Sequence, residues 1–272
     1  MSLPYELISL DLDLTLLNAD HQISPRNLEA VHRCRDLGAK VIITSGRMYC
    51  TTLAFLRAMG LDTPVISYNG AFIKRESTGE ILLNEHLDVT TAQDLVDYCE
   101  REGLHLNYYL DDTLYTAKAT QWSDLYASRT GATIHPVGDL RVFADRAPTK
   151  VLIVDEPERI TRLYQELSVR YAGRAYVTIS NAEYLEFMPP EIDKGTALSA
   201  VAAYYGIAQE KVIAFGDAGN DIPAIRWAGM GVAMDNAKPE TKAVADRIAP
   251  RYDADGVAQV LEEIFGLTPS HV

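Results

Sequence analysis

Two aspartates separated by one residue follow an apolar segment near the beginning of the chain. Asp11 and Asp13 come directly after residues 5–10, which predict a buried strand. Residues two apart on a strand point to the same side, so both carboxylates can face the crevice at the carboxyl end of a sheet, where open α/β folds bind ligands. Two acids in one small site repel each other unless a cation lies between them or one holds a proton. The pair therefore indicates a site for a hard metal ion, a nucleophile with an acid–base partner, or both.

Three other segments place polar side chains at the end of a strand or the start of a helix. Ser45, Gly46 and Arg47 follow the apolar residues 41–43, and a hydroxyl with free backbone N–H groups at a strand end can hold a phosphate oxygen. Lys194 precedes an apolar-periodic helix and can act as a point charge for an anion. The last segment, after the apolar residues 212–215, is Gly216-Asp217-Ala218-Gly219-Asn220-Asp221. Each segment alone is explained by a turn, a solvated lysine or a helix start, but turn chemistry does not explain all of them in one chain.

The order of these segments resembles that of one protein family. The motifs are Asp-x-Asp-x-Thr at 11–15, Thr-Ser-Gly-Arg at 44–47, Lys-Gly at 194–195 and Gly-Asp-x-x-Asn-Asp at 216–221. In this order they are similar to the haloacid dehalogenase superfamily, and most closely to its Cof-type phosphatases, which carry a large α+β cap. The resemblance extends from about residue 7 to about residue 258, which is nearly the whole chain.

The resemblance implies a catalytic role for four residues. Asp11 would be the nucleophile that forms an aspartyl-phosphate. Asp13 would protonate the leaving alkoxide and then deprotonate the attacking water. The Ser45 hydroxyl and the Lys194 ammonium would hold phosphoryl oxygens as charge spreads onto them.

The resemblance also implies a metal and further substrate contacts. The expected cofactor is Mg²⁺, with the Asp11 carboxylate, the Asp13 backbone carbonyl and Asp217 as ligands. Asn220 and Asp221 would bind the metal directly or orient its waters, although Asp221 is also explained as an acid at a helix N-terminus. The residues expected to contact substrate are Ser45, Gly46, Arg47, Lys194 and Asn220, and a plain salt bridge explains Arg47 equally well.

Three loop residues bear on the geometry of the site. Leu14 stands where this family most often has glycine, so it would be strained if the loop needs a positive φ there. Thr15 is expected to fix the loop rather than to touch the substrate. Asn69 precedes Gly70, and this pair is first of all a turn signal.

The elements that must position these residues alternate between strands and helices at both ends of the chain. The pattern up to about residue 70 and again from residue 194 indicates a parallel sheet, whereas residues 85–185 lack strict alternation. We therefore expect an α/β protein with a doubly wound, Rossmann-type parallel-sheet core (1–84 and 186–272) and an inserted α+β cap domain (85–185) that selects the substrate. Within the cap, a helix over 91–101 is expected to be capped by Thr90 or Thr91.

Composition limits the partners of the protein. The chain has 272 residues and a formal net charge of −13, which argues against a nucleic-acid partner. No apolar run approaches the ~20 residues of a membrane span, and the N-terminus lacks the features of a signal peptide, so a cytoplasmic location without a membrane partner is expected. Cys34, Cys50 and Cys99 fit no zinc or disulfide pattern and are expected to be reduced thiols. The expected partner is a small phosphorylated metabolite, and the expected state is a monomer or a weak homodimer.

These observations favour a Mg²⁺-dependent phosphatase of small phosphorylated metabolites that acts through an aspartyl-phosphate. Sugar phosphates are the first expectation for the substrate, followed by nucleotides and pyridoxal phosphate. A phosphomutase shares the nucleophile, but it would need a cap that retains a bisphosphate and excludes water. A phospho-ligand sensor without catalysis would be favoured by the loss of a motif carboxylate, and all of Asp11, Asp13, Asp217 and Asp221 are present.

Overall fold

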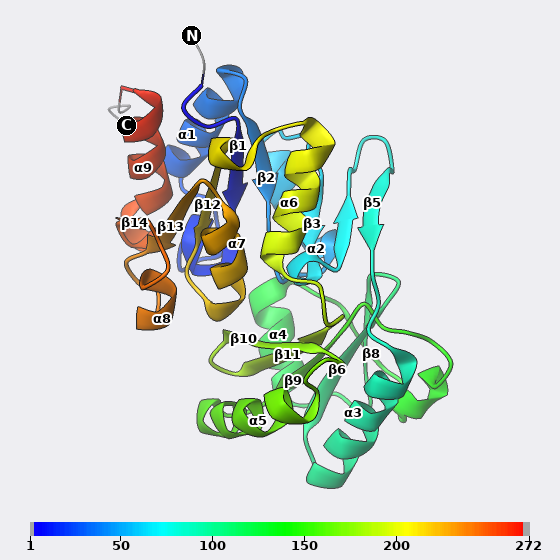
Figure 1. The fold of residues 1–272 in the computed structure, drawn as a ribbon. Helices are drawn as coiled ribbons and strands as arrows, with labels where there is room; N and C mark the ends of the chain where they lie inside the picture. Colours follow the sequence, from blue (N-terminus) through cyan, green and yellow to red (C-terminus); the bar gives the residue numbers. More distant parts are fainter. Residues whose placement is uncertain (1–2, 269–272) are drawn as a thin grey trace.

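A five-stranded parallel sheet forms the centre of the protein (Figure 1). The structure is a computed structural model that describes residues 3–268. The strand order is β14-β13-β12-β1-β2, and every neighbouring pair is parallel. The bounds are β1 (Leu7–Leu10), β2 (Lys40–Ile43), β12 (Val212–Gly216), β13 (Met230–Met234) and β14 (Arg247–Ala249). Because β1 and β12 are neighbours, the acidic segments that follow them begin side by side at one edge of the sheet.

Helices cover both faces of this sheet, as the predicted doubly wound fold requires. They are α1 (Pro25–Asp36), α2 (Tyr49–Ala58), α6 (Lys194–Tyr205), α7 (Ile222–Trp227), α8 (Pro239–Lys242) and α9 (Gly256–Phe265). In β1, Ile8 and Leu10 pack into one apolar cluster with residues of α1 and α9, whereas Leu7 packs into another with residues of α6 and α7. Successive residues of a strand point to opposite faces, so the fully buried strand β1 supplies apolar side chains to both cores.

A second block, the cap, lies against the carboxyl ends of the parallel strands (Figure 1). Its sheet has six strands in the order β10-β11-β9-β6-β7-β8, with only β7 and β8 paired in parallel. The strands are β6 (His105–Leu110), β7 (Thr113–Thr116), β8 (Ile134–Pro136), β9 (Lys150–Val154), β10 (Tyr176–Asn181) and β11 (Tyr184–Met188), and the helices are α3 (Val89–Glu102), α4 (Gln121–Thr130) and α5 (Pro157–Arg170). The boundary predicted at residue 185 falls inside β11, and a paired strand is not divided between two domains. The cap sheet therefore continues to Met188.

A small third sheet lies on the path of the chain between core and cap. Its strand β3 (Val65–Ser67) pairs antiparallel with β4 (Phe72–Lys74), and β4 pairs with β5 (Ile81–Asn84). A parallel bridge between Thr44 and Ile66 also joins β3 to the central sheet, in line with the parallel pattern predicted up to about residue 70. The turn at Asn69 and Gly70 reverses the chain directly after β3, so β3 finds its partner locally.

Other differences from the predicted elements are small. The cap of α3 is Asp88 rather than a threonine, because its carboxylate accepts the Thr91 N–H at 2.9 Å. The strands β8 and β14 were not predicted. The three cysteines are free, as expected. Among residues 3–268, no helix combines the length and the apolar character needed to cross a bilayer.

Candidate active site

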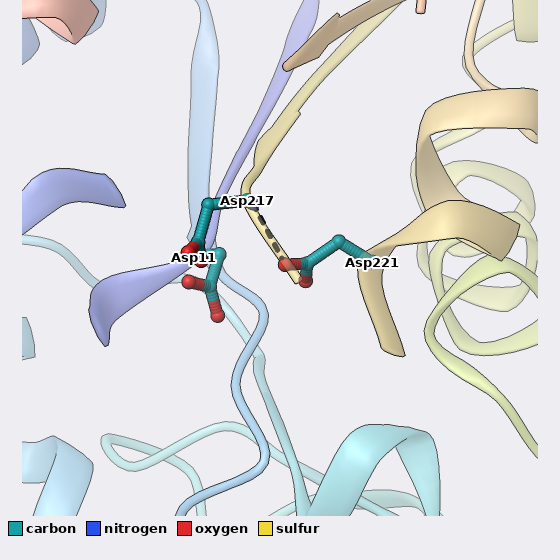
Figure 2. Close-up of side chains that lie close together, drawn as sticks. All are labelled: Asp11, Asp217 and Asp221. Atoms are coloured by element: carbon teal, nitrogen blue, oxygen red, sulfur yellow. Dashed lines mark hydrogen bonds between the residues drawn. The ribbon is translucent and has the colours of Figure 1, made fainter. Parts of the chain in front are cut away.

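Three of the predicted acidic residues meet at the carboxyl edge of the parallel sheet (Figure 2). Asp11 follows β1, Asp217 follows β12, and Asp221 lies in the turn before α7. One carboxylate oxygen from each lies within 4.8 Å of the others, and all three residues are buried. The parallel topology thus brings together two motifs that are more than 200 residues apart in the sequence.

Lys194 lies between two of these carboxylates. Its ammonium donates to Asp11 Oδ1 at 2.7 Å and to Asp221 Oδ1 at 2.5 Å, and the residue is only 1% exposed. The side chain of Asp193 caps α6 by accepting the Thr196 N–H at 2.7 Å, which makes Lys194 the first residue of the helix. A fixed helix start therefore aims the lysine into the acidic group.

Asp221 fixes the shape of the loop that carries Asp217. Its second oxygen, Oδ2, accepts the backbone N–H groups of Asp217 and Ala218, each at 3.0 Å. With Lys194 on Oδ1, both oxygens already have protein partners. An interaction with the helix dipole is thus an incomplete explanation of Asp221, because its carboxylate also binds the backbone of its own loop and the ammonium of Lys194.

The electrostatics of this group favour a divalent cation. Burial, together with the charge of Asp221, raises the pKa of Asp11 to about 7, even though Lys194 acts to lower it. Burial and the charges of Asp221 and Asp11 raise the pKa of Asp217 to about 9. Burial acts to lower the pKa of Lys194, but the two carboxylates outweigh it and raise that pKa. One lysine is therefore too little positive charge for three buried carboxylates, and a hard cation with oxygen ligands fits the residues present.

We expect Lys194→Met to lower the free energy of unfolding by about 3 kcal/mol in chelator, because breaking a buried ion pair leaves uncompensated charge. Added Mg²⁺ should restore part of this loss and should stabilise the variant more than it stabilises the unmodified protein. Chemical denaturation with and without Mg²⁺ measures both effects. An unchanged unfolding free energy in chelator would mean that Lys194 does not balance the acidic group.

Asp13 and Arg47 form a salt bridge at the mouth of the site. Arg47 donates from Nε to Asp13 Oδ2 at 2.7 Å and from Nη2 to Asp13 Oδ1 at 2.5 Å. Arg47 also donates to the backbone carbonyl of Arg129 in the cap at 3.1 Å. The salt-bridge interpretation of Arg47 therefore describes this structure, and the partner is the residue expected to act as acid and base.

Leu14 has the positive φ that would strain a leucine at this position. Its φ is +58°, in the left-handed region, and the side chain is 44% exposed. The Leu14 carbonyl accepts a hydrogen bond from Asn236 Nδ2 at 2.9 Å. A left-handed residue with a Cβ costs about 1–2 kcal/mol, so the loop after β1 keeps a strained leucine where glycine would be relaxed. The Thr15 hydroxyl donates to Asp217 Oδ1 at 3.5 Å and so connects this loop to the acidic group. This contact agrees with the expectation that Thr15 fixes the loop.

A cavity of about 330 Å³ lies between the core and the cap. Its core side includes Asp11, Ser45 and Asp217, and its cap side includes Arg129, Lys150 and Tyr184. The predicted residues Asp13, Gly46, Arg47, Asn220 and Asp221 also line it. The Ser45 hydroxyl accepts the backbone N–H of Arg47 at 3.2 Å, and the backbone N–H of Ser45 donates to the Ile66 carbonyl at 2.9 Å. These two N–H groups are therefore not free in this structure, whereas the sequence had suggested free N–H groups for an anion site.

The hydrogen bonds of Asn220 lead to residues that sequence reasoning missed. Its amide donates to Asn69 Oδ1 at 2.8 Å, and Asn69 donates to Glu186 of the cap at 2.7 Å. The turn interpretation of Asn69 is therefore incomplete, although its φ of +54° fits a turn. Lys150 and Glu186 form a buried ion pair at 2.8 Å. The one available signal was a charged residue inside each of two apolar strands, Lys150 before Val-Leu-Ile-Val and Glu186 within Tyr-Leu-Glu-Phe-Met.

Comparison with known proteins agrees with this geometry. A family model described as haloacid dehalogenase-like hydrolase matches residues 8–261. The 5-amino-6-(5-phospho-D-ribitylamino)uracil phosphatase YitU of Bacillus subtilis (strain 168) is 34% identical, over 97% of this chain and 98% of the relative. The pyridoxal phosphate phosphatase YbhA of Escherichia coli (strain K12) is 27% identical, over 94% of this chain and 97% of the relative. The crystal structure of a haloacid dehalogenase-like hydrolase from Bacteroides thetaiotaomicron matches with a TM-score of 0.85 and 31% identity, over 96% of this chain and 100% of that one.

Proposed function

Because the chain belongs to the haloacid dehalogenase-like hydrolases and is a hydrolase of phosphoric monoesters, we propose that it is a Mg²⁺-dependent phosphatase of small phosphorylated metabolites that uses Asp11 as its nucleophile. The observation that carries this proposal is the buried group of Asp11, Asp217 and Asp221 around Lys194. Its position at the carboxyl ends of parallel strands is where this class of fold binds ligands.

The first half of the reaction transfers the phosphoryl group to Asp11. Lys194 holds Asp11 Oδ1, which leaves Oδ2 to attack phosphorus. As the new O–P bond forms, the bond from phosphorus to the leaving oxygen breaks, and Asp13 gives that oxygen a proton. Ser45 and Lys194 stabilise the charge on the remaining phosphoryl oxygens.

The second half returns Asp11 to its starting state. Asp13, now a carboxylate, takes a proton from a water that attacks the phosphorus of the aspartyl-phosphate. The O–P bond to Asp11 breaks, and inorganic phosphate leaves. The two Arg47 hydrogen bonds orient the Asp13 carboxylate between these steps.

The residues that would hold Mg²⁺ are Asp11, the backbone carbonyl of Asp13 and Asp217, and Asn220 and Asp221 would bind directly or orient its waters. When bound, the ion neutralises charge between the Asp11 carboxylate and the phosphoryl group. The donors are carboxylate and carbonyl oxygens, which is the ligand set that Mg²⁺ prefers.

The cavity and the relatives bear on the class of substrate. A volume of about 330 Å³ suits a small metabolite rather than a polymer. Two relatives are named for phosphorylated compounds that contain a heterocycle, and Tyr126 and Tyr184 line the cavity here. We therefore place phosphorylated heterocycles beside sugar phosphates as candidate substrates, with the cap as the element that selects between them. The complete set of motif carboxylates supports a catalyst rather than a sensor.

A panel of phosphorylated metabolites tests the proposal. Sugar phosphates, nucleotides, pyridoxal phosphate and p-nitrophenyl phosphate are incubated with the full chain and Mg²⁺, and released phosphate is measured. We expect turnover of p-nitrophenyl phosphate and a higher kcat/KM for at least one metabolite. Transfer of phosphate between two positions of a sugar, without release, would favour a phosphomutase, and binding of metabolites without either reaction would favour a sensor.

A further inference from the structure

A chain of buried hydrogen bonds connects the cap to the metal-site loop. Lys150 donates to Glu186 Oε2 at 2.8 Å, and Asn69 Nδ2 donates to the same oxygen at 2.7 Å. Asn220 Nδ2 then donates to Asn69 Oδ1 at 2.8 Å. All of these residues are buried, with Lys150 and Glu186 in the cap and Asn69 and Asn220 in the core. The chain of contacts therefore exists only while cap and core are together.

The chemistry of these groups fixes the direction of every bond in the chain. A carboxylate can only accept hydrogen bonds, so Asn69 must present its NH₂ to Glu186. The Asn69 oxygen then faces Asn220, and an amide oxygen also can only accept, so Asn220 must present its own NH₂ to Asn69. Lys150 keeps Glu186 in the accepting form by pairing with it as an ammonium. The orientation of two asparagine amides thus follows from one carboxylate of the cap.

The Asn220 oxygen ends this series of hydrogen bonds. Asn220 Oδ1 is buried, and no group among residues 3–268 donates a hydrogen bond to it. An unsatisfied buried acceptor costs about 1–3 kcal/mol, and a structure retains it where a ligand or water supplies the donor. Asn220 lines the catalytic cavity. We call the hydrogen bonds from Lys150 through Glu186 and Asn69 to Asn220 the relay. The relay leaves the Asn220 oxygen available to accept a hydrogen bond from a group that binds in this cavity.

We propose that Glu186, held by Lys150, is a positioning residue that sets the direction of the Asn69 and Asn220 amides, so that Asn220 offers an acceptor to the loaded catalytic site when the cap is closed. This inference rests on the proposed phosphatase function. The donor it serves is a water or hydroxyl that enters with the metal or the substrate. Lys150 also donates to the Gly46 carbonyl at 2.8 Å, so the same pair holds the loop after β2 against the cap.

Three variants test the relay. Glu186→Met removes the acceptor, and we expect kcat for p-nitrophenyl phosphate to fall about 10- to 100-fold, as for other groups that orient a metal site. In this structure the Ser180 hydroxyl donates to the other carboxylate oxygen of Glu186, Oε1. Glu186→Gln should therefore keep most of the activity, because its amide oxygen can still accept from Asn69 and Lys150 while its NH₂ donates to the Ser180 oxygen. The double variant Glu186→Met/Asn69→Asp removes the carboxylate at position 186 and places one at position 69. This new carboxylate can accept the hydrogen bond from Asn220 that the Asn69 oxygen accepts in the unmodified protein. We expect this double variant to be more active than Glu186→Met alone.

The controls separate the relay from a loss of stability and from a failure of the proposed function. Glu166→Met, a change of the same type on the outer helix α5, should leave kcat unchanged. In denaturation without metal or substrate, Asn69→Asp should destabilise the protein when Glu186 is present and stabilise it when position 186 is methionine. If Glu186→Met does not fold, Lys150→Met/Glu186→Met is compared with Lys150→Met/Glu186→Gln, and only the first should lose activity.

Two results would overturn the relay, namely an unchanged kcat in Glu186→Met, or a further loss of kcat when Asn69→Asp is added to it. A protein that folds but hydrolyses no ester would instead contradict the proposed function. The change of sign in the unfolding free energies would then still decide whether the relay exists.

Discussion

Asp11→Asn is expected to lower kcat for any phosphate ester by more than about 10³-fold, because it removes the nucleophile on which both chemical steps depend. Asparagine keeps the shape of the side chain and an oxygen for Lys194. The environment of Asp11 already favours its neutral form, as its raised pKa indicates. The unfolding free energy of the metal-free variant should therefore equal or exceed that of the unmodified protein.

Initial rates and denaturation curves measured on the same preparation check this prediction. Asp36→Asn, on the exposed surface of α1, is the matched control and should leave both quantities unchanged. Retention of more than about a hundredth of the activity in Asp11→Asn would remove Asp11 from the role of nucleophile.

The second large effect concerns the metal. Excess chelator should abolish activity, and Mg²⁺ should restore it, whereas Ca²⁺ should not, because Ca²⁺ takes more ligands at longer distances and disturbs in-line geometry. Asp217→Ala should raise the Mg²⁺ concentration required for half-maximal rate at least about 10-fold, since it removes an expected ligand. Titration of the rate with Mg²⁺ in both proteins measures this shift. Full activity in excess chelator would contradict the metal assignment.

The acidic group was predictable from the sequence because local pattern and topology suffice to assemble it. An apolar run followed by a carboxylate predicts a strand end, and parallel strands place their carboxyl ends at one edge. Because β1 and β12 are adjacent parallel strands, Asp11 and Asp217, which follow them, lie next to each other. For Leu14, only the family's usual glycine at this position suggested that the loop could need a positive φ, and the structure has that φ.

The relay between cap and core was not predictable in the same way. Asn69 and Glu186 are separated by 117 residues, and their meeting depends on how the cap is seated, which no local pattern encodes. Each residue also has a simpler local explanation, because Asn69 fits a turn and Glu186 fits a polar position in a strand. The Asp13–Arg47 pair was only one of two open interpretations, because the side-chain direction of an arginine depends on which carboxylate lies within reach.

Errors in the predicted elements have a similar origin. The segment around β3 has the apolar character of a parallel strand and makes one parallel bridge to the central sheet, but the Asn69-Gly70 turn gives it an antiparallel partner as well, which was not predicted. The cap of α3 was assigned to threonine because hydroxyls are good caps. Asp88, which lies two residues before Thr90 and three before Thr91, instead accepts the N–H of Thr91. Residue type alone did not decide between adjacent capping candidates.

Trapping of the covalent intermediate tests the central claim most directly. The full chain with Mg²⁺ is mixed with radiolabelled phosphate ester, quenched within milliseconds in acid, and then treated with borohydride, which reduces an acyl phosphate to an alcohol and releases phosphate. The account predicts label on the protein before reduction and homoserine at position 11 afterwards, with neither in Asp11→Asn. Full turnover without protein-bound phosphate, or homoserine at any other position, would contradict it.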